Sequence, residues 1–93
     1  MAQTVQREVI IPNNAGMHLR PAAAFVRTAN KYKNCDVRVI RDNQSANGKS
    51  IMGLVMLAAT KGTKLTIECT GEDCEKALEE LCDLVENHFG MDT

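Results

Sequence analysis

The spacing of apolar residues changes several times along the chain, and the order of these changes constrains the fold more than any other feature of the sequence. Strict alternation is typical of a strand, whereas apolar residues three and four positions apart are typical of a helix. Alternation and turn signals predict strands at residues 4–11, 35–41, 44–47 and 63–69, and helical spacing predicts helices at residues 19–31, directly after Ser50, and after the segment 70–73. The order β-α-β-β-α-β-α predicts an α/β (α+β) open-faced sandwich, in which three helices cover one face of a mostly antiparallel four-stranded sheet.

Turn-forming and helix-capping residues separate these segments. The run Pro12-Asn13-Asn14-Ala15-Gly16 ends the first strand, Asp42-Asn43 predicts a tight turn between two strands, and Lys61-Gly62 precedes the last strand. Ser50 stands at the N-cap position of the second helix. Thr70 is expected to cap the last helix, whose acidic first turn suits the helix dipole.

Each predicted element carries one apolar face, and these faces define the predicted core. The strands contribute Val5, Val9, Ile11, Cys35, Val37, Val39, Leu65, Ile67 and Cys69. The first and last helices contribute Leu19, Ala22, Ala23, Phe25, Val26, Ala29, Ala77, Leu78, Leu81, Cys82 and Val85. Arg7 interrupts the apolar face of the first strand, so we expect part of that face to be open to water. The outer face of the last helix is predicted to be solvated, since it carries Glu75, Glu79, Glu80, Asp83 and Glu86.

Length and composition exclude several classes of protein. The 93 residues are expected to form one domain, residues 1–93, with 44% apolar and 25% charged residues. A net charge of −1 and only 3% aromatic residues argue against a nucleic-acid partner and against a generic ferredoxin-like ligand or RNA module. No apolar run approaches the about 18 residues of a membrane span. The first residues also lack the apolar segment of a signal peptide. We therefore expect a cytoplasmic protein that is not inserted in a membrane.

The four cysteines do not form a recognisable metal or redox motif. Cys35 and Cys69 lie in predicted strands, and Cys74 and Cys82 lie in one predicted helix. No C-x-x-C pair occurs, and both histidines are far from any cysteine in the sequence. We expect four reduced, buried cysteines, no metal site and no cofactor.

His18 is the strongest candidate for chemistry. It directly precedes the first helical pattern, which has Pro21 in its first turn, and Arg20 follows two residues later. A helix start offers unpaired N–H groups and the positive end of the helix dipole to an anion. A neutral imidazole beside such a site and a guanidinium group is suited to accept a phosphoryl group. The alternative interpretation is a helix-capping histidine without chemistry, and a structural role is expected for His88.

Two motifs resemble the signatures of one family. The segments His18-Leu19-Arg20-Pro21-Ala22 and Lys49-Ser50-Ile51-Met52-Gly53 resemble those of HPr, the histidine-containing phosphocarrier family of the bacterial phosphoenolpyruvate-dependent phosphotransferase system, with sugar and nitrogen-related branches. The order and length of the elements match this family from Thr4 to about Phe89. The resemblance implies an HPr-like open-faced sandwich. Leu19 departs from the family pattern, which has a small or polar residue at that position.

The resemblance also implies a function. Phosphorylated Enzyme I would transfer a phosphoryl group to Nδ1 of His18, Arg20 would steady that group, and Enzyme IIA domains would receive it during sugar uptake or its regulation. The protein would be a monomeric carrier in a relay rather than an enzyme. The alternative is a regulatory binding module of the same family, either in the nitrogen-related branch or with a Ser50-phosphorylated form that binds a transcription regulator. The sequence does not separate these branches.

The helix after Ser50 is apolar on all sides, which indicates an exposed apolar face or, alternatively, looser core packing. By resemblance, the docking patch around His18 would comprise Leu19, Ala23, Arg27, Ile51, Met52 and Val55. Ser50 is either a plain N-cap or also a regulatory site that a serine kinase/phosphorylase modifies.

Overall fold

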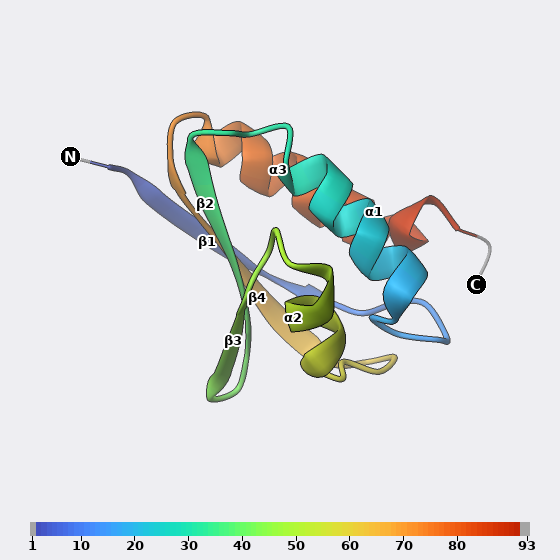
Figure 1. Ribbon diagram of the computed structural model, residues 1–93. Coiled ribbons are helices and arrows are strands. Elements are labelled where there is room, and N and C mark those ends of the chain that lie inside the picture. The colour runs from blue at the N-terminus through green and yellow to red at the C-terminus, as the bar shows by residue number, and fades with distance from the viewer. Residues whose placement is uncertain (1, 92–93) are drawn as a thin grey trace.

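A four-stranded antiparallel sheet forms one layer of the structure, and three α-helices pack on one of its faces (Figure 1). The computed structural model describes residues 2–91. The strands are β1 (Thr4–Ile10), β2 (Cys35–Arg41), β3 (Gln44–Asn47) and β4 (Lys64–Gly71), and the helices are α1 (Leu19–Ala29), α2 (Ile51–Met56) and α3 (Cys74–Glu86). A short 3₁₀ helix, η1 (His88–Gly90), follows α3. The predicted order of elements and the open-faced sandwich are confirmed.

The strand order is β1-β4-β2-β3, so within residues 2–91 the first strand pairs with the last one, β4. Thr4 lies opposite Thr70 in the β1–β4 pair, and Val39 lies opposite Ile67 in the β2–β4 pair. The hairpin between β2 and β3 turns at Asp42, whose φ of 51° is in the left-handed region that aspartate tolerates better than most residues. The predicted Asp42-Asn43 turn is confirmed.

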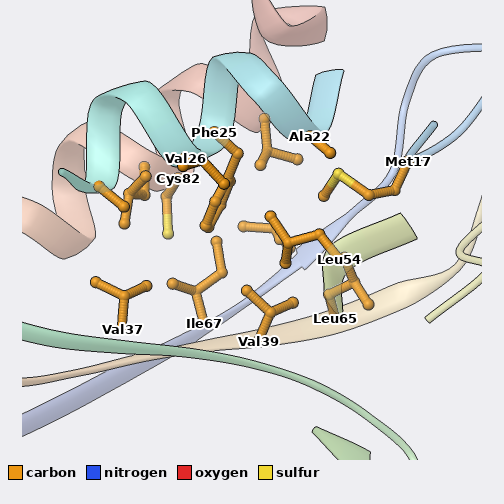
Figure 2. Close-up of a cluster of buried hydrophobic side chains, with 14 of the residues drawn as sticks. Met17, Ala22, Phe25, Val26, Val37, Val39, Leu54, Leu65, Ile67 and Cys82 are labelled. Atoms are coloured by element: carbon orange, nitrogen blue, oxygen red, sulfur yellow. The ribbon is translucent and has the colours of Figure 1, made fainter. Parts of the chain in front are cut away.

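The core lies between the inner face of the sheet and the helices (Figure 2). Phe25 of α1 and Leu54 of α2 are fully buried against Ile67 of β4, and Leu81 of α3 is also fully buried. Nearly all predicted core positions are buried, because one face of each strand and one stripe of each long helix point inward. Leu19 is the clear exception, since its side chain is 59% exposed.

The start of the last helix differs from the prediction. Thr70 does not cap α3, because β4 continues through Gly71 and Thr70 pairs with β1 on one side and β2 on the other. Pairing on both sides satisfies the backbone of residue 70 within the sheet, and its hydroxyl bonds to that of Thr4 at 2.9 Å. Asp73 takes the N-cap position instead, with a φ of 58° and no side-chain cap bond.

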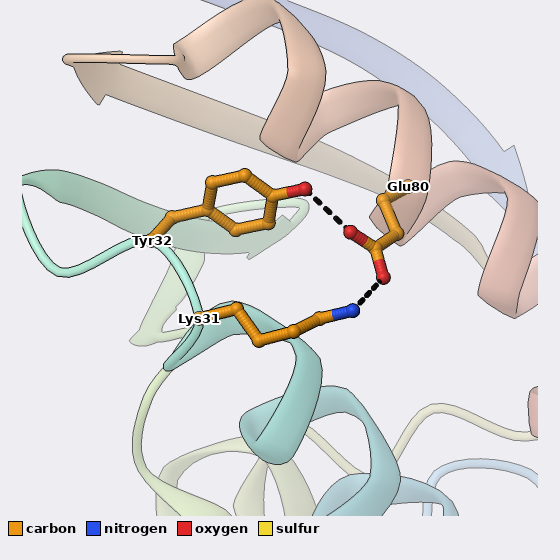
Figure 3. A network of polar contacts seen from close by, with 3 residues as sticks. All are labelled: Lys31, Tyr32 and Glu80. Carbon is orange, nitrogen blue, oxygen red and sulfur yellow. Dashed lines mark hydrogen bonds and ion pairs between the residues drawn. The ribbon is translucent and has the colours of Figure 1, made fainter.

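A polar network joins the C-terminal end of α1 to α3 (Figure 3). The carboxylate of Glu80 accepts hydrogen bonds from the Tyr32 hydroxyl and from Lys31 Nζ. The hydrogen bond to Glu80 and partial burial raise the pKa of Tyr32 to about 12, and the bonds from Lys31 and Tyr32 lower the pKa of Glu80. The predicted solvated acidic face holds for Glu75, Glu79, Asp83 and Glu86, which are exposed, whereas Glu80 is half-buried and joins α3 to the segment that follows α1.

Candidate functional site

His18 occupies the N-cap position of α1. Its backbone is extended, with φ −98° and ψ −166°, and its carbonyl oxygen accepts a hydrogen bond of 2.9 Å from the N–H of Ala22. Its side chain is exposed and makes no cap hydrogen bond. The capping alternative for the imidazole is therefore wrong, and the ring is accessible to an incoming group.

The loop before His18 is held against the segment that follows α2. The N–H of Met17 donates a 2.8 Å hydrogen bond to the carbonyl of Ala59, and the Met17 side chain is buried in the core (Figure 2). Gly16 has a φ of +73°, and a Cβ atom there would lie 2.3 Å from the Ala59 carbonyl oxygen. Only glycine fits this close approach, and the contact with Ala59 fixes the backbone conformation of the loop before α1.

The start of α1 is electropositive in the way that the sequence predicted. The N–H groups of Leu19 and Arg20 precede the first complete helical turn and have no intrahelical acceptor, and Pro21 has no N–H to satisfy. The positive end of the helix dipole lies at the same place. Arg20 is exposed, so its guanidinium group is accessible to an anion that approaches the imidazole.

Ser50 caps α2, as predicted. Its Oγ accepts a 3.0 Å hydrogen bond from the N–H of Gly53, and its carbonyl accepts one of 3.1 Å from the N–H of Leu54. The preceding residue, Lys49, donates from Nζ to the carbonyl of Tyr32 at 2.8 Å. This bond therefore joins the loop before α2 to the segment that follows α1.

An apolar face of α2 is exposed. Leu54 is fully buried, whereas Ile51, Met52 and Met56 are 37%, 60% and 76% exposed. The prediction of an exposed apolar face is confirmed, because a helix of only six residues has room for one buried stripe.

Helices α1 and α2 pack against each other and bring the predicted docking residues onto neighbouring elements (Figure 1). Leu19 and Arg27 are exposed on α1, whereas Ala23 is half-buried. On α2, Val55 is also half-buried and packs against the core. The accessible part of the predicted docking patch is therefore Leu19, Arg27, Ile51 and Met52.

Sequence reasoning missed Arg41 at this site. Its Nη1 donates hydrogen bonds to the carbonyls of Leu57 at 2.7 Å and Ala58 at 3.1 Å, directly after α2. Ala58 has a φ of 54°, so α2 ends in a left-handed residue that is not glycine. The guanidinium group stabilises this end by satisfying carbonyls that the helix leaves unpaired.

The four cysteines are free and buried, as predicted. Burial raises the pKa of Cys35 and Cys82, and burial with the neighbouring Cys35 thiol raises the pKa of Cys69 to about 12. Such thiols are poor nucleophiles at neutral pH. Within residues 2–91, no group of three or more His, Cys, Asp or Glu side chains is placed to hold a metal ion. Over the same residues, no helix combines the length and apolar character of a membrane span.

Comparisons with known proteins agree on one family. The family model described as "PTS HPr component phosphorylation site" matches residues 5–87. Phosphocarrier protein HPr of Pseudomonas aeruginosa is 47% identical over 83 residues, which cover 88% of this chain and 91% of that protein. HPr of Neisseria meningitidis serogroup B is 41% identical over 86 residues, with 92% and 96% covered. The HPr-like protein Crh of Bacillus subtilis is 43% identical over 82 residues, with 88% and 95% covered.

Solved structures show the same likeness. The crystal structure of HPr-C-His from Thermoanaerobacter tengcongensis has a TM-score of 0.89 at 38% identity and covers 96% of this chain and 99% of that chain. The crystal structure of Bacillus subtilis Crh has a TM-score of 0.73 at 42% identity, with 90% and 95% covered, and was described as a dimer with an unexpected swapping domain. An HPr dimer from Thermoanaerobacter tengcongensis has a TM-score of 0.74 at 41% identity, with 89% and 94% covered.

Proposed function

This chain belongs to the HPr family of phosphocarrier proteins, and we propose that it accepts a phosphoryl group on His18 from phosphorylated Enzyme I and passes it to Enzyme IIA domains. The observation that carries this proposal is the exposed imidazole at the start of α1, which makes no cap bond and is followed two residues later by the exposed Arg20. The protein is then a reactant in each transfer rather than an enzyme with its own turnover.

The proposed step uses Nδ1 of neutral His18 as the nucleophile. Its lone pair forms a bond to phosphorus while the bond from phosphorus to the donor breaks, and the bonding electrons leave with the donor. The guanidinium group of Arg20 and the N–H groups at the start of α1 neutralise the charge on the phosphoryl oxygens. In the second transfer a nucleophile of the Enzyme IIA domain attacks the phosphorus, and the bond from phosphorus to Nδ1 breaks and leaves its electrons on His18.

The exposed apolar face of α2 supports a docking role beside His18. We assign partner docking to Leu19, Ala23, Arg27, Ile51, Met52 and Val55, of which Leu19, Arg27, Ile51 and Met52 are exposed. A flexible side chain such as Met52 adapts to surfaces of different shape, which suits a carrier that meets both a donor and an acceptor.

Ser50 is assigned a second, regulatory role through phosphorylation by a serine kinase. A phosphate at this position would suit the amide groups at the start of α2 and would also place two negative charges beside Ile51 and Met52. The likeness to Crh, which is described as a catabolite repression HPr of Bacillus subtilis, favours a regulatory binding module as the second candidate function. The presence of His18 and Arg20 favours the carrier.

A direct labelling experiment tests the carrier. The protein is incubated with phosphoenolpyruvate and Enzyme I, and we expect one equivalent of acid-labile, base-stable phosphate on His18. His18→Ala should abolish the label and leave the fold unchanged, because the imidazole is exposed and makes no hydrogen bond to the N–H groups at the helix start. His88→Ala serves as the control and should accept a full equivalent. A labelled His18→Ala variant would overturn the assignment.

We further propose that the carrier acts as a monomer in the bacterial cytoplasm, although two structural relatives were solved as dimers. Light scattering behind size exclusion measures the assembly directly. A mass near 10.2 kDa supports the monomer, and twice that mass contradicts it.

A further inference from the structure

Asn13 is buried in the loop that leads to His18. It is 1% exposed and is the one polar or charged residue that is buried among residues 2–91. Its side-chain Nδ2 donates a 2.9 Å hydrogen bond to the backbone carbonyl oxygen of Gly16. The backbone carbonyl oxygen of Asn13 accepts a 3.2 Å bond from the N–H of Gly16. Two hydrogen bonds thus close the loop between residues 13 and 16.

The carbonyl oxygen of Gly16 has a second donor. The N–H of His18 bonds to it at 3.1 Å, so the side chain of Asn13 and the backbone of His18 converge on one oxygen. A carbonyl oxygen has two lone pairs, and both are used here. The direction of the Gly16 carbonyl therefore depends on Asn13, and the backbone of His18 depends on that carbonyl.

The other end of the Asn13 amide is not satisfied. Its Oδ1 is buried and has no hydrogen-bond partner among the described residues. A buried acceptor without a donor lowers the stability of the fold. The bond from Nδ2 to the Gly16 carbonyl is therefore the one polar contact that the described residues give this side chain.

We propose that Asn13 is a positioning residue for phosphoryl transfer, which it serves by fixing the Gly16 carbonyl and, through it, the backbone and imidazole of His18. This inference rests on the proposed function of His18. Transfer requires the attacking nitrogen to lie in line with the phosphorus at close approach, so small displacements of the nucleophile slow it strongly. The N–H of His18 is bonded to the Gly16 carbonyl. The N–H groups of Leu19 and Arg20, in the first turn of α1, have no intrahelical acceptor and can bind the phosphoryl oxygens.

The test compares Asn13→Asp with Asn14→Asp. Both variants add one negative charge to the same loop. Asn14 is exposed, and its Oδ1 accepts from Lys61 Nζ at 3.1 Å, a bond that a carboxylate retains. An ionised carboxylate at position 13 cannot donate to Gly16. Transfer from phosphorylated Enzyme I is measured at about pH 8.5, because burial raises the pKa of a carboxyl group at position 13 and a high pH favours its ionised form.

We expect Asn13→Asp to lower the transfer rate at saturating donor by about 10- to 100-fold, with KM changed by less than about threefold. For Asn14→Asp both quantities should stay within about threefold of wild type, because its contact is kept. If Asn13→Asp does not fold, Asn13→Ala takes its place. It removes the donor together with the unpartnered Oδ1.

Hydrogen exchange of the His18 N–H gives a readout that does not depend on phosphoryl transfer. This amide should be protected in wild type and in Asn14→Asp, and its protection should fall in the folded Asn13 variant. A folded Asn13 variant with wild-type rate or wild-type protection overturns the positioning role and leaves the proposed function intact. A raised KM at an unchanged saturating rate also overturns it. A wild-type protein that accepts no phosphoryl group overturns the proposed function itself, whatever the exchange data show.

Discussion

Arg41, the last residue of β2, donates a hydrogen bond of 2.7 Å from Nη1 to the carbonyl oxygen of Leu57, beyond the C-terminal end of α2. A second bond of 3.1 Å reaches Ala58. Ser50 caps the other end of this six-residue helix. Side chains thus satisfy both ends of the helix that presents the exposed apolar face.

Removal of this guanidinium group should destabilise the protein. Arg41→Ala leaves the carbonyls of Leu57 and Ala58 without their charged donor, and we expect the free energy of unfolding to fall by about 1–3 kcal/mol. Denaturant unfolding measures this loss. Arg38→Ala is the control, because Arg38 is exposed and its side chain bonds, among the described residues, to the hydroxyl of Ser45 alone. Its effect should be within about 0.5 kcal/mol. Equal effects of the two variants would show that Arg41 does not stabilise the end of α2.

Arg20→Ala should slow phosphoryl transfer more than it weakens docking. The guanidinium group is expected to act on the charge of the transferring group, so its loss should reduce the saturating rate by roughly 10²–10³-fold. Arg27→Ala, a second exposed arginine of α1, is the matched control and should weaken affinity for Enzyme I without changing that rate. Rapid-mixing kinetics with phosphorylated Enzyme I separates the two quantities. An unchanged rate in Arg20→Ala with weaker binding would move Arg20 to the docking surface.

Ser50→Asp and Ser50→Ala should separate the capping role of Ser50 from its effect on partner binding. Aspartate is also a good N-cap, so Ser50→Asp should keep the stability of the fold, whereas Ser50→Ala should lose about 1 kcal/mol. The added charge must be desolvated when a partner covers Ile51 and Met52, so Ser50→Asp should bind Enzyme I more weakly, and less so at high salt. Titration of Enzyme I against both variants checks this. Equal affinities and rates for Ser50→Asp and wild type would leave Ser50 with a capping role alone.

The network around Glu80 predicts a loss of stability at high pH. The pKa of Tyr32 is raised from 10.0 to about 12, so the unfolded chain releases this proton first as the pH rises. The contribution of Tyr32 is therefore present below pH 10 and is lost between pH 10 and about 12. The difference in unfolding free energy between wild type and Tyr32→Phe should shrink across this range. A difference that is constant with pH would contradict the bond to Glu80.

The same network should weaken at low pH for the opposite reason. The bonds from Lys31 and Tyr32 lower the pKa of Glu80 below its ordinary value of 4.5, so the folded protein keeps the carboxylate ionised longer than the unfolded chain does. Its contribution is present above pH 4.5 and is lost as the pH falls through the lowered pKa. The effect is small, because Lys31 and Glu80 are partly exposed to water. The stability difference between wild type and Glu80→Gln, followed by acid titration, measures it.

Much of the fold follows from local patterns in the sequence. The spacing of apolar residues predicted β1, β2, β4 and the α-helices, because sheet and helix positions that face the core repeat with different periods. The turn signal Asp42-Asn43 predicted β3. The N-cap role of Ser50 and the position of His18 at a helix start were also predicted. Both depend on neighbours within a few residues, which a single sequence contains.

The errors and omissions all depend on contacts between distant segments. Threonine is a residue type that often caps helices, but Thr70 pairs with β1 on one side and with β2 on the other, and this keeps it in the sheet. The bond from Arg41 to Leu57 spans 16 residues, and the bond from Tyr32 to Glu80 spans 48. The burial of Asn13 depends on the same long-range packing, and its sequence context indicated only a turn.

The strand order described above also determines when this protein can fold during synthesis. β1 and β2 are not neighbours in the sheet, because β4 lies between them and pairs with both. While the chain grows on the ribosome, Val9 has no strand partner until residues 64–71 have been made. Until then the apolar faces of β1 and α1 are not buried by β4. The sheet is therefore completed only after residues 64–71 have left the exit tunnel, through contacts of high sequence separation.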